Sequence, residues 1–124
     1  MNLGYKELNV YKEAYALAMN IFELTKEWPK EEKYSMIDQI RRSSRAVCSN
    51  IAEGYRKRQY PAHFSSKVSD ADMENTETQV WLDFSLSCQY ITQSLHQELT
   101  NKSKQIGRML HYMILNPEKF QDRK

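Results

Sequence analysis

Basic side chains gather in one segment of the sequence and indicate contact with an anionic partner. The basic residues between positions 41 and 58 are Arg41, Arg42, Arg45, Arg56, Lys57 and Arg58. Glu53 is the one acidic residue there, so six positive charges against one negative charge give this segment a net charge of +5. Guanidinium and ammonium groups bind phosphates, and the segment is therefore a candidate surface for RNA or DNA with a steep salt dependence.

The acidic residues that follow offer a second interpretation of the same arginines. Residues 64–83 hold one lysine against five carboxylates, a net charge of −4. The arginines can pair with Glu74 and Glu77, or with carboxylates of a neighbouring subunit, instead of with phosphates. The two interpretations are compatible, because Arg41 and Arg42 point about 100° apart on a helix.

Polar residues within and after the basic segment predict a structural network. Asn50 and Glu53 are three residues apart, and no histidine or nucleophile is spaced to make Glu53 a general base. We therefore expect both to hydrogen-bond across helices, with Gln39 or an arginine, and to fix the register of the packing. The predicted structural polar network consists of Gln39, Asn50, Glu53, Glu74 and Glu77.

Metal, nucleophile and cofactor motifs are missing from the sequence. Di-iron sites in helix bundles require Glu-x-x-His pairs, but Tyr, Gln and Arg stand three residues before the three histidines. There is no glycine-rich phosphate loop and no G-x-S-x-G motif. Cys48 and Cys88 have no obvious histidine partner, and we interpret both as small core residues. The sequence thus predicts no catalytic, cofactor-binding or metal-binding residue, and a protein that is not an enzyme.

Tyrosine is abundant, with eight copies in this short chain. Not all of these rings fit a narrow core, and tyrosine suits a subunit interface because it combines apolar area with a polar tip. Stacking on single-stranded bases is the alternative, since Tyr55 and Tyr60 flank the basic residues 56–58. The interface is the interpretation that we favour.

Apolar residues recur at helical spacing in four segments of the chain. In the first segment they advance in steps of three and four from Val10 to Trp28. In the third segment Asn75 and Thr78 make the stripe polar in its middle, which predicts a tighter or partly hydrated layer. The predicted helices cover residues 8–27, 35–58, 61–90 and 93–115, each to within a few residues.

Prolines and hydroxyl residues mark the ends of these helices. Pro29 and Pro117 end the first and last helices, because the residue before a proline disfavours helical geometry. Pro61 suits the first position of the third helix, where its missing N–H costs nothing. Ser35, three residues before an aspartate, is a weak capping box for the second helix, and Thr92 is a candidate cap for the fourth.

Length and composition limit the fold further. A chain of 124 residues fits one domain, here residues 1–124, and 40% hydrophobic residues favour a folded core over disorder. No run approaches the roughly 20 apolar residues of a membrane span, and the N-terminal residues lack the apolar region of a signal peptide, so we expect a cytoplasmic protein. Four helices joined by short turns must fold back on one another. The predicted fold is an all-α, antiparallel, up-down-up-down four-helix bundle.

Three stretches of the chain resemble a known family of bacterial proteins. Residues 5–14, YKELNVYKEA, are similar to the pattern Y-x-x-L-x-V-W-x-x-A, and residues 74–82, ENTETQVWL, to E-x-x-E-T-x-x-W-L. Most specific are residues 39–54, QIRRSSRAVCSNIAEG, which resemble Q-L-R-R-A-x-x-S-I-x-x-N-I-A-E-G, with Ala46 in place of the usual serine. The family is that of the four-helix bundle proteins encoded in intervening sequences of large-subunit ribosomal RNA genes.

This resemblance implies properties that the residues alone do not. Members resemble homo-oligomeric four-helix bundles, commonly rings of five, and most have no assigned biochemical activity. Some relatives are accessory proteins of diversity-generating retroelements that bind nucleic acid and a reverse transcriptase. The function expected from residues and resemblance together is a non-enzymatic homo-oligomer, with a pentamer favoured, that binds RNA or DNA through the basic segment. The alternative is a protein-interaction scaffold, with a partner such as a reverse transcriptase, that does not bind nucleic acid.

Overall fold

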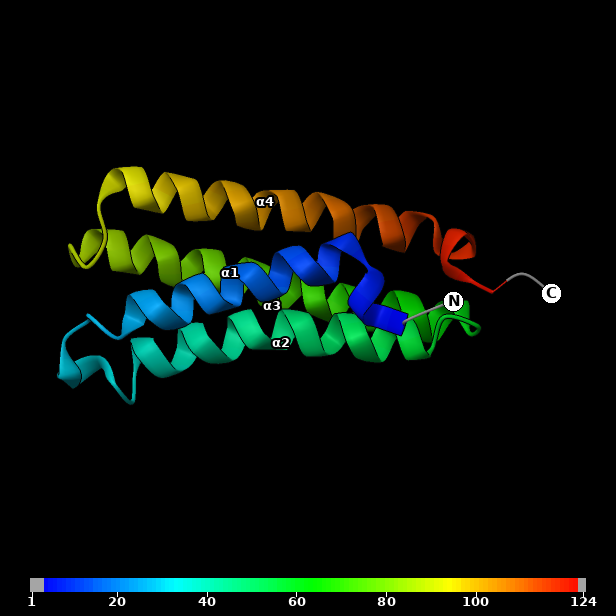
Figure 1. Ribbon diagram of the computed structural model, residues 1–124, viewed down its shortest axis with the longest axis horizontal. Coiled ribbons are helices and arrows are strands. Elements are labelled where there is room, and N and C mark those ends of the chain that lie inside the picture. Colours follow the sequence, from blue (N-terminus) through cyan, green and yellow to red (C-terminus); the bar gives the residue numbers. More distant parts are fainter. Residues whose placement is uncertain (1–3, 123–124) are drawn as a thin grey trace.

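Four long helices dominate the computed structural model, which describes residues 4–122 (Figure 1). They are α1 (Asn9–Thr25), α2 (Met36–Arg56), α3 (Pro61–Ser87) and α4 (Gln93–Leu115). Three short 3₁₀ helices accompany them: η1 (Gly4–Glu7), η2 (Lys30–Glu32) and η3 (Pro117–Phe120). The described residues contain no strand, so the predicted all-α class is confirmed, and the helices pack as a four-helix bundle.

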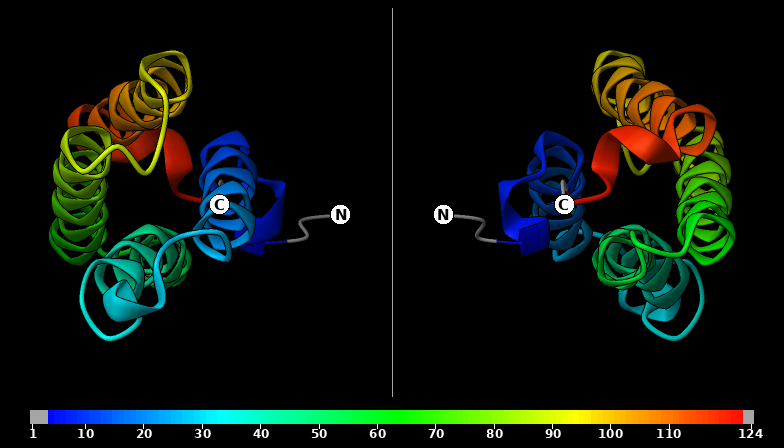
Figure 2. Two further views of the ribbon diagram at one scale, coloured as in Figure 1. Left: turned by 90° about the vertical axis from the view of Figure 1, so that its left-hand side faces the viewer. Right: turned by 90° about the vertical axis from the view of Figure 1, so that its right-hand side faces the viewer.

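The four helices surround one core of buried side chains, and Figure 2 shows their ribbons seen along the long axis of the molecule. Each helix turns its predicted apolar stripe inward, and the core draws on all four. Burying one such side chain completely contributes roughly 1.5–3 kcal/mol to folding. The large hydrophobic side chains with no exposed surface include Ile21, Ile40, Ile51, Phe64, Val68, Leu82 and Leu110.

The polar middle of α3 points into this core. Asn75 Nδ2 donates to the Ser103 carbonyl oxygen of α4 at 2.8 Å, and Ser103 Oγ donates to Asn75 Oδ1 at 2.9 Å. On the other side of α3, the hydroxyls of Thr78 and Ser43 of α2 lie 2.8 Å apart and share a hydrogen bond. All four side chains are buried, and their polar atoms bond to one another across the helix contacts. The layer between α2, α3 and α4 is therefore held by directional contacts as well as by apolar burial.

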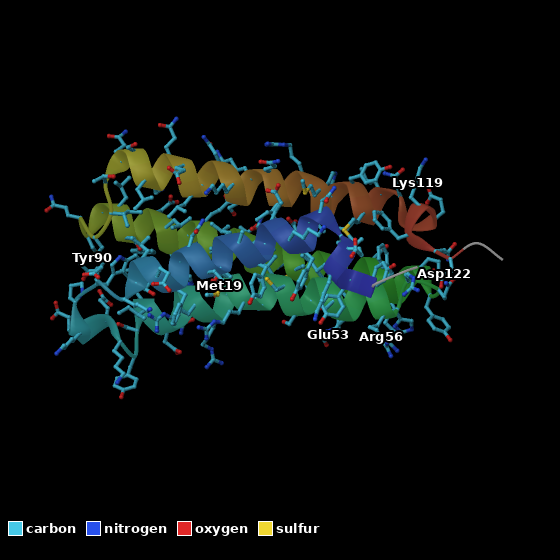
Figure 3. The ribbon with its side chains drawn as sticks, in the orientation of Figure 1. Met19, Glu53, Arg56, Tyr90, Lys119 and Asp122 are labelled. Carbon is cyan, nitrogen blue, oxygen red and sulfur yellow. The ribbon has the colours of Figure 1, made fainter. Side chains whose placement is uncertain are left out.

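The loop between α1 and α2 is closed by a carboxylate rather than by a serine cap. Ser35 makes no capping hydrogen bond to α2, so the predicted capping box is wrong. Its hydroxyl donates instead to Glu32 Oε1 at 2.6 Å, while Tyr90 donates its hydroxyl to Glu32 Oε2 at 2.8 Å. These two hydrogen bonds, the one from Ser35 first, lower the pKa of Glu32. The same contact raises the pKa of Tyr90 to about 12. Tyr90 follows α3 in the chain, so this cluster ties the two loops at one end of the bundle together (Figure 3).

The end of α3 departs from the prediction. The helix was expected to reach residue 90 but ends at Ser87, because Gln89 adopts a positive φ of 63° that a helix cannot continue through. Cys88 lies in this turn and is exposed, so its predicted place in the core is wrong, whereas Cys48 is buried as predicted. Thr92 Oγ1 accepts a hydrogen bond from the Leu95 N–H at 3.1 Å, which confirms the predicted cap of α4.

Replacing Asn75 by alanine should lower the free energy of unfolding by about 1–3 kcal/mol, because the buried Ser103 carbonyl oxygen then loses its donor. Thr76→Ala is the matched control: this neighbour is exposed, and its hydroxyl bonds only within α3, so we expect a change below about 0.5 kcal/mol. Urea unfolding followed by circular dichroism measures both variants. Equal unfolding midpoints would show that the hydrogen bonds between α3 and α4 contribute nothing.

Candidate nucleic-acid interface

The sequence of α2 forces its charges outward. The buried residues of this helix are all uncharged: Met36, Ile37, Ile40, Ser43, Ser44, Val47, Cys48, Ile51 and Gly54. Arg42, Arg45 and Arg56 fall on the opposite side and are exposed. At 1.5 Å per residue, Arg42 and Arg56 stand about 21 Å apart along the helix axis. The outer side of α2 thus presents cations at two places, around Arg42 and Arg45 and at its end around Arg56.

Arg41 is engaged in joining α2 to α1. Its Nε donates to Thr25 Oγ1 at 2.8 Å, and its Nη2 donates to the Phe22 carbonyl oxygen at 3.4 Å. The guanidinium also lies over the Phe22 ring, 4.7 Å from its centroid. Carbonyl groups in the last turn of a helix lack partners within the helix and attract cations. Arg41 therefore acts first as a clamp on the end of α1.

Arg58, just beyond α2, is engaged in the same way near the C-terminus. Its Nη2 lies 2.9 Å from Asp122 Oδ2, and its Nε donates to Asp122 Oδ1 at 3.1 Å, so the pair is bidentate. Its guanidinium lies over the Tyr55 ring at 4.2 Å from the centroid. Arg56 and Asp122 lie at one end of the molecule (Figure 3). Here the aspartate already occupies the position that a phosphate would take.

Four of the six predicted cations have no carboxylate partner among the described residues. Arg42, Arg45, Arg56 and Lys57, which we call the α2 basic face, form no ion pair or side-chain hydrogen bond with any described residue, 4–122. The guanidinium of Arg45 makes a cation–π contact, 5.7 Å from the centroid of the Phe22 ring. These four side chains are the part of the basic segment that is free to meet an anion.

The acidic residues of α3 do not neutralise these arginines within residues 4–122. Glu77 Oε2 accepts a hydrogen bond from Trp81 Nε1 at 3.3 Å instead. Burial raises the pKa of Glu74, and the nearby charges of Glu77 and Asp70 raise it further. A carboxyl with its pKa raised in this way has gained no cationic partner. Pairing of the arginines with Glu74 and Glu77 is therefore absent from the described part of the chain.

The predicted polar network forms only in part, around a residue that the sequence interpretation missed. Lys67 of α3 donates to Asn50 Oδ1 at 3.4 Å and lies 3.4 Å from Glu53 Oε1. Asn50 Nδ2 donates to the Ala46 carbonyl oxygen of its own helix at 3.0 Å. Gln39 is exposed, and its side chain bonds to no residue among those described. Lys67 is the only lysine or arginine among residues 64–83 of the sequence. This isolated position among carboxylates was the sequence signal that could have identified it as a partner of Glu53.

A groove lined by tyrosines runs between α1 and α2, and the sequence interpretation did not anticipate it. Its volume is about 540 Å³. The ring centroids of Tyr5 and Tyr11 are 4.9 Å apart, and those of Tyr11 and Tyr15 are 6.1 Å apart. Burial raises the pKa of the Tyr11 phenol. The i, i+4 spacing of two tyrosines followed by a methionine at i+8 was the sequence signal. The groove, which we call the tyrosine groove, is lined by Tyr5, Tyr11, Tyr15, Ala18, Met19, Arg45, Cys48, Ser49, Ala52 and Glu53.

Groups suited to metal chemistry do not gather in the part of the chain that the structure describes. No three His, Cys, Asp or Glu side chains there are placed to hold a metal ion. The one buried thiol, Cys48, has its pKa raised to about 11 by burial, so it is a poor nucleophile near neutral pH. No described helix is both long enough and apolar enough to span a bilayer.

Comparison with known proteins identifies a matching family and a similar solved structure. The sequence profile of the 23S rRNA-intervening sequence protein family matches residues 6–112. A crystal structure of a protein of unknown function from the S23 ribosomal protein family of Bacteroides thetaiotaomicron superposes with a TM-score of 0.75. The two sequences are 30% identical, and the match covers 85% of this chain and 94% of the other. No curated protein matches the sequence.

The two thiols should differ sharply in reactivity. At pH 8 we expect an aromatic disulfide reagent to modify Cys88 promptly, because this side chain is exposed. Cys48 should react only on unfolding, because burial keeps it protonated and covered. The absorbance of the released thiolate measures both phases. The fast phase should vanish in Cys88→Ser and persist in Cys48→Ser, and a fast phase that survives in Cys88→Ser would contradict the burial of Cys48.

Proposed function

The chain belongs to the 23S rRNA-intervening sequence protein family, and from its surface we propose that it is a non-enzymatic protein that binds nucleic acid through the α2 basic face. The observation that carries this proposal is the availability of Arg42, Arg45, Arg56 and Lys57, four exposed cations without a carboxylate partner in residues 4–122. Each can contact a phosphate without first breaking an ion pair.

The expected affinity is modest for one copy of the chain. Four phosphate contacts correspond to a slope of log K against log salt of about −3 for single strands and about −3.6 for duplex DNA. Such binding is dominated by the backbone and carries little sequence information. Several copies in one assembly would add their contacts and raise the apparent affinity. The proposal therefore includes an oligomer.

Self-association of the bundle, with a pentamer favoured, is the second part of the proposal. Support comes from the outer side of α3, where Met73, Val80 and Phe84 are 67%, 43% and 54% exposed. Their spacing of seven and four places them on one stripe of the helix. Exposed apolar side chains that share one stripe favour an interaction site there, and the exposed Glu77 lies on the same stripe between Met73 and Val80. Within each copy, the short connections between consecutive helices support an antiparallel, up-down-up-down order of the four helices.

A protein-interaction scaffold is the second candidate function. The acidic outer side of α3 favours it, because Asp70, Glu74 and Glu77 form no ion pair with any residue in the described range 4–122. A basic protein, such as a polymerase that itself binds nucleic acid, fits this side. Capture of one protein partner that survives nuclease treatment would favour this candidate over direct binding of nucleic acid.

Neutralising part of the α2 basic face should weaken nucleic-acid binding selectively. The double substitution Arg42→Gln and Arg45→Gln removes two phosphate contacts, so the salt slope should become shallower by about 1.4–1.8 and affinity should fall at every salt concentration. Fluorescence anisotropy of a labelled mixed-sequence oligonucleotide, titrated between low and physiological salt, measures both quantities.

The matched control for this experiment removes the same charge from another helix. Lys104 and Arg108 of α4 are exposed and form no ion pair with the described residues, so Lys104→Gln with Arg108→Gln should leave the slope unchanged. Equal losses in the two double variants would reduce the effect to net charge. A wild-type protein that fails to bind at low salt would refute the proposed function.

Charge placed on the α3 stripe should dissociate the oligomer. Val80→Glu with Phe84→Glu replaces two exposed apolar side chains by carboxylates beside the existing Glu77, so the mass in solution should fall to that of one chain. Leu115→Glu, an exposed apolar residue at the end of α4, is the control and should leave the mass unchanged. Analytical ultracentrifugation measures all three proteins, and an unchanged mass in the α3 variant would exclude the stripe as the contact.

A further inference from the structure

We propose that the tyrosine groove receives unpaired bases, so that the preferred ligand of this protein is single-stranded nucleic acid. This inference rests on the proposed function and assigns the ligand class within it. The α2 basic face supplies affinity for phosphates and the groove supplies contacts to the faces of bases. Its premise is that the two surfaces are continuous, because Arg45 belongs to both.

Aromatic rings in the groove are arranged as a row with an open end. Tyr5 meets Tyr11 edge to face at an interplanar angle of 71°, and Tyr11 is tilted by 34° from Tyr15. Tyr15, the last ring of the row, is 54% exposed and is therefore available to a further planar group. A base stacked on such a ring is a sequence-tolerant contact, because every base has a π-face. Met19, one helical turn beyond Tyr15, is 42% exposed and extends this apolar edge.

Charge in the groove fits a polyanion along its rim. Arg45 stands on the α2 side without a carboxylate partner among residues 4–122, and Arg42 lies one turn away on the same helix. The only carboxylate in the lining is Glu53, which is held by Lys67 Nζ at 3.4 Å. Met19 on α1 and Glu53 on α2 are both labelled in Figure 3, and they contribute to opposite sides of the lining. Phosphates can follow the arginines while the bases turn toward the tyrosines.

The size and shape of the groove favour single strands over duplexes. Its volume of about 540 Å³ is within the range of roughly 300–1,000 Å³ that is typical of sites for small organic groups. In a duplex the base faces are already stacked on one another, so the tyrosines cannot reach them without unpairing the strands. A duplex would then gain only phosphate contacts, and its affinity should be that of the α2 basic face alone.

The test separates base contacts from phosphate contacts. Three ligands carry the same backbone length: a 12-nucleotide oligothymidylate, a strand of abasic deoxyribose phosphates, and a 12-base-pair duplex. At fixed low salt we expect the wild-type protein to bind oligothymidylate about tenfold more tightly than the abasic strand. Tyr15→Ala should remove this preference and leave the affinity for the abasic strand unchanged, whereas Tyr15→Phe should retain the preference.

Tyr34→Ala is the matched control, because Tyr34 is 85% exposed and lies in the loop between α1 and α2, outside the groove. It should bind all three ligands as the wild type does. Equal wild-type affinity for oligothymidylate and the abasic strand would overturn the inference and leave the proposed function standing. Failure to bind any of the three ligands would refute both. A fall in solution mass in Tyr15→Ala would also overturn the inference, because the groove would then be a contact between copies of the chain.

Discussion

The close approach of α2 to α3 is the constraint on which the rest of the molecule depends. A Cβ at Gly54 would lie 3.2 Å from the Lys67 Cβ and 3.6 Å from the Phe64 carbonyl oxygen, so the two backbones nearly touch there. The 2.8 Å contact of the Ser43 and Thr78 hydroxyls holds the same pair of helices at mid-length. The inner side of α2 carries only uncharged residues, with a serine and a glycine at these two points of close contact. Its six basic neighbours in sequence must therefore lie on the outside or at the helix ends.

Helix positions followed from the sequence because one periodic pattern sets them. The stripe of α3 remained readable through Asn75 and Thr78, and the structure shows that these polar residues face inward because each finds a partner on a neighbouring helix. The helix ends were less predictable. Ser35 prefers the carboxylate of Glu32 to the backbone of α2, and Gln89 takes a positive φ that no spacing rule requires. Local competition of this kind involves differences of about 1 kcal/mol, which a pattern of apolar residues does not encode.

In the candidate site, too, the positions of residues on their helices could be predicted from the sequence, whereas their contact partners could not. Periodicity placed the arginines on α2, but it could not show that Arg41 would bond to Thr25, or that Arg58 would meet Asp122, because these contacts join residues 16 and 64 positions apart. It also could not distinguish Lys67 from the arginines as the partner of Glu53. An anion can bind most readily to the cations that have no partner within the protein. Which cations these are depends on the tertiary structure and cannot be read from the spacing of residues in the sequence.

Arg41 joins α2, which carries the unpaired cations, to α1, which carries two tyrosines of the groove. Its hydrogen bonds to Thr25 and Phe22 fix the end of α1 against α2, and the Phe22 ring in turn lies beneath both Arg41 and Arg45. A groove between two helices keeps its width only if the helices cannot slide, and a site with its shape set before binding loses less entropy when a ligand arrives. The clamp thus fixes the geometry of α1 against α2, and the proposed binding surface would profit from this rigidity.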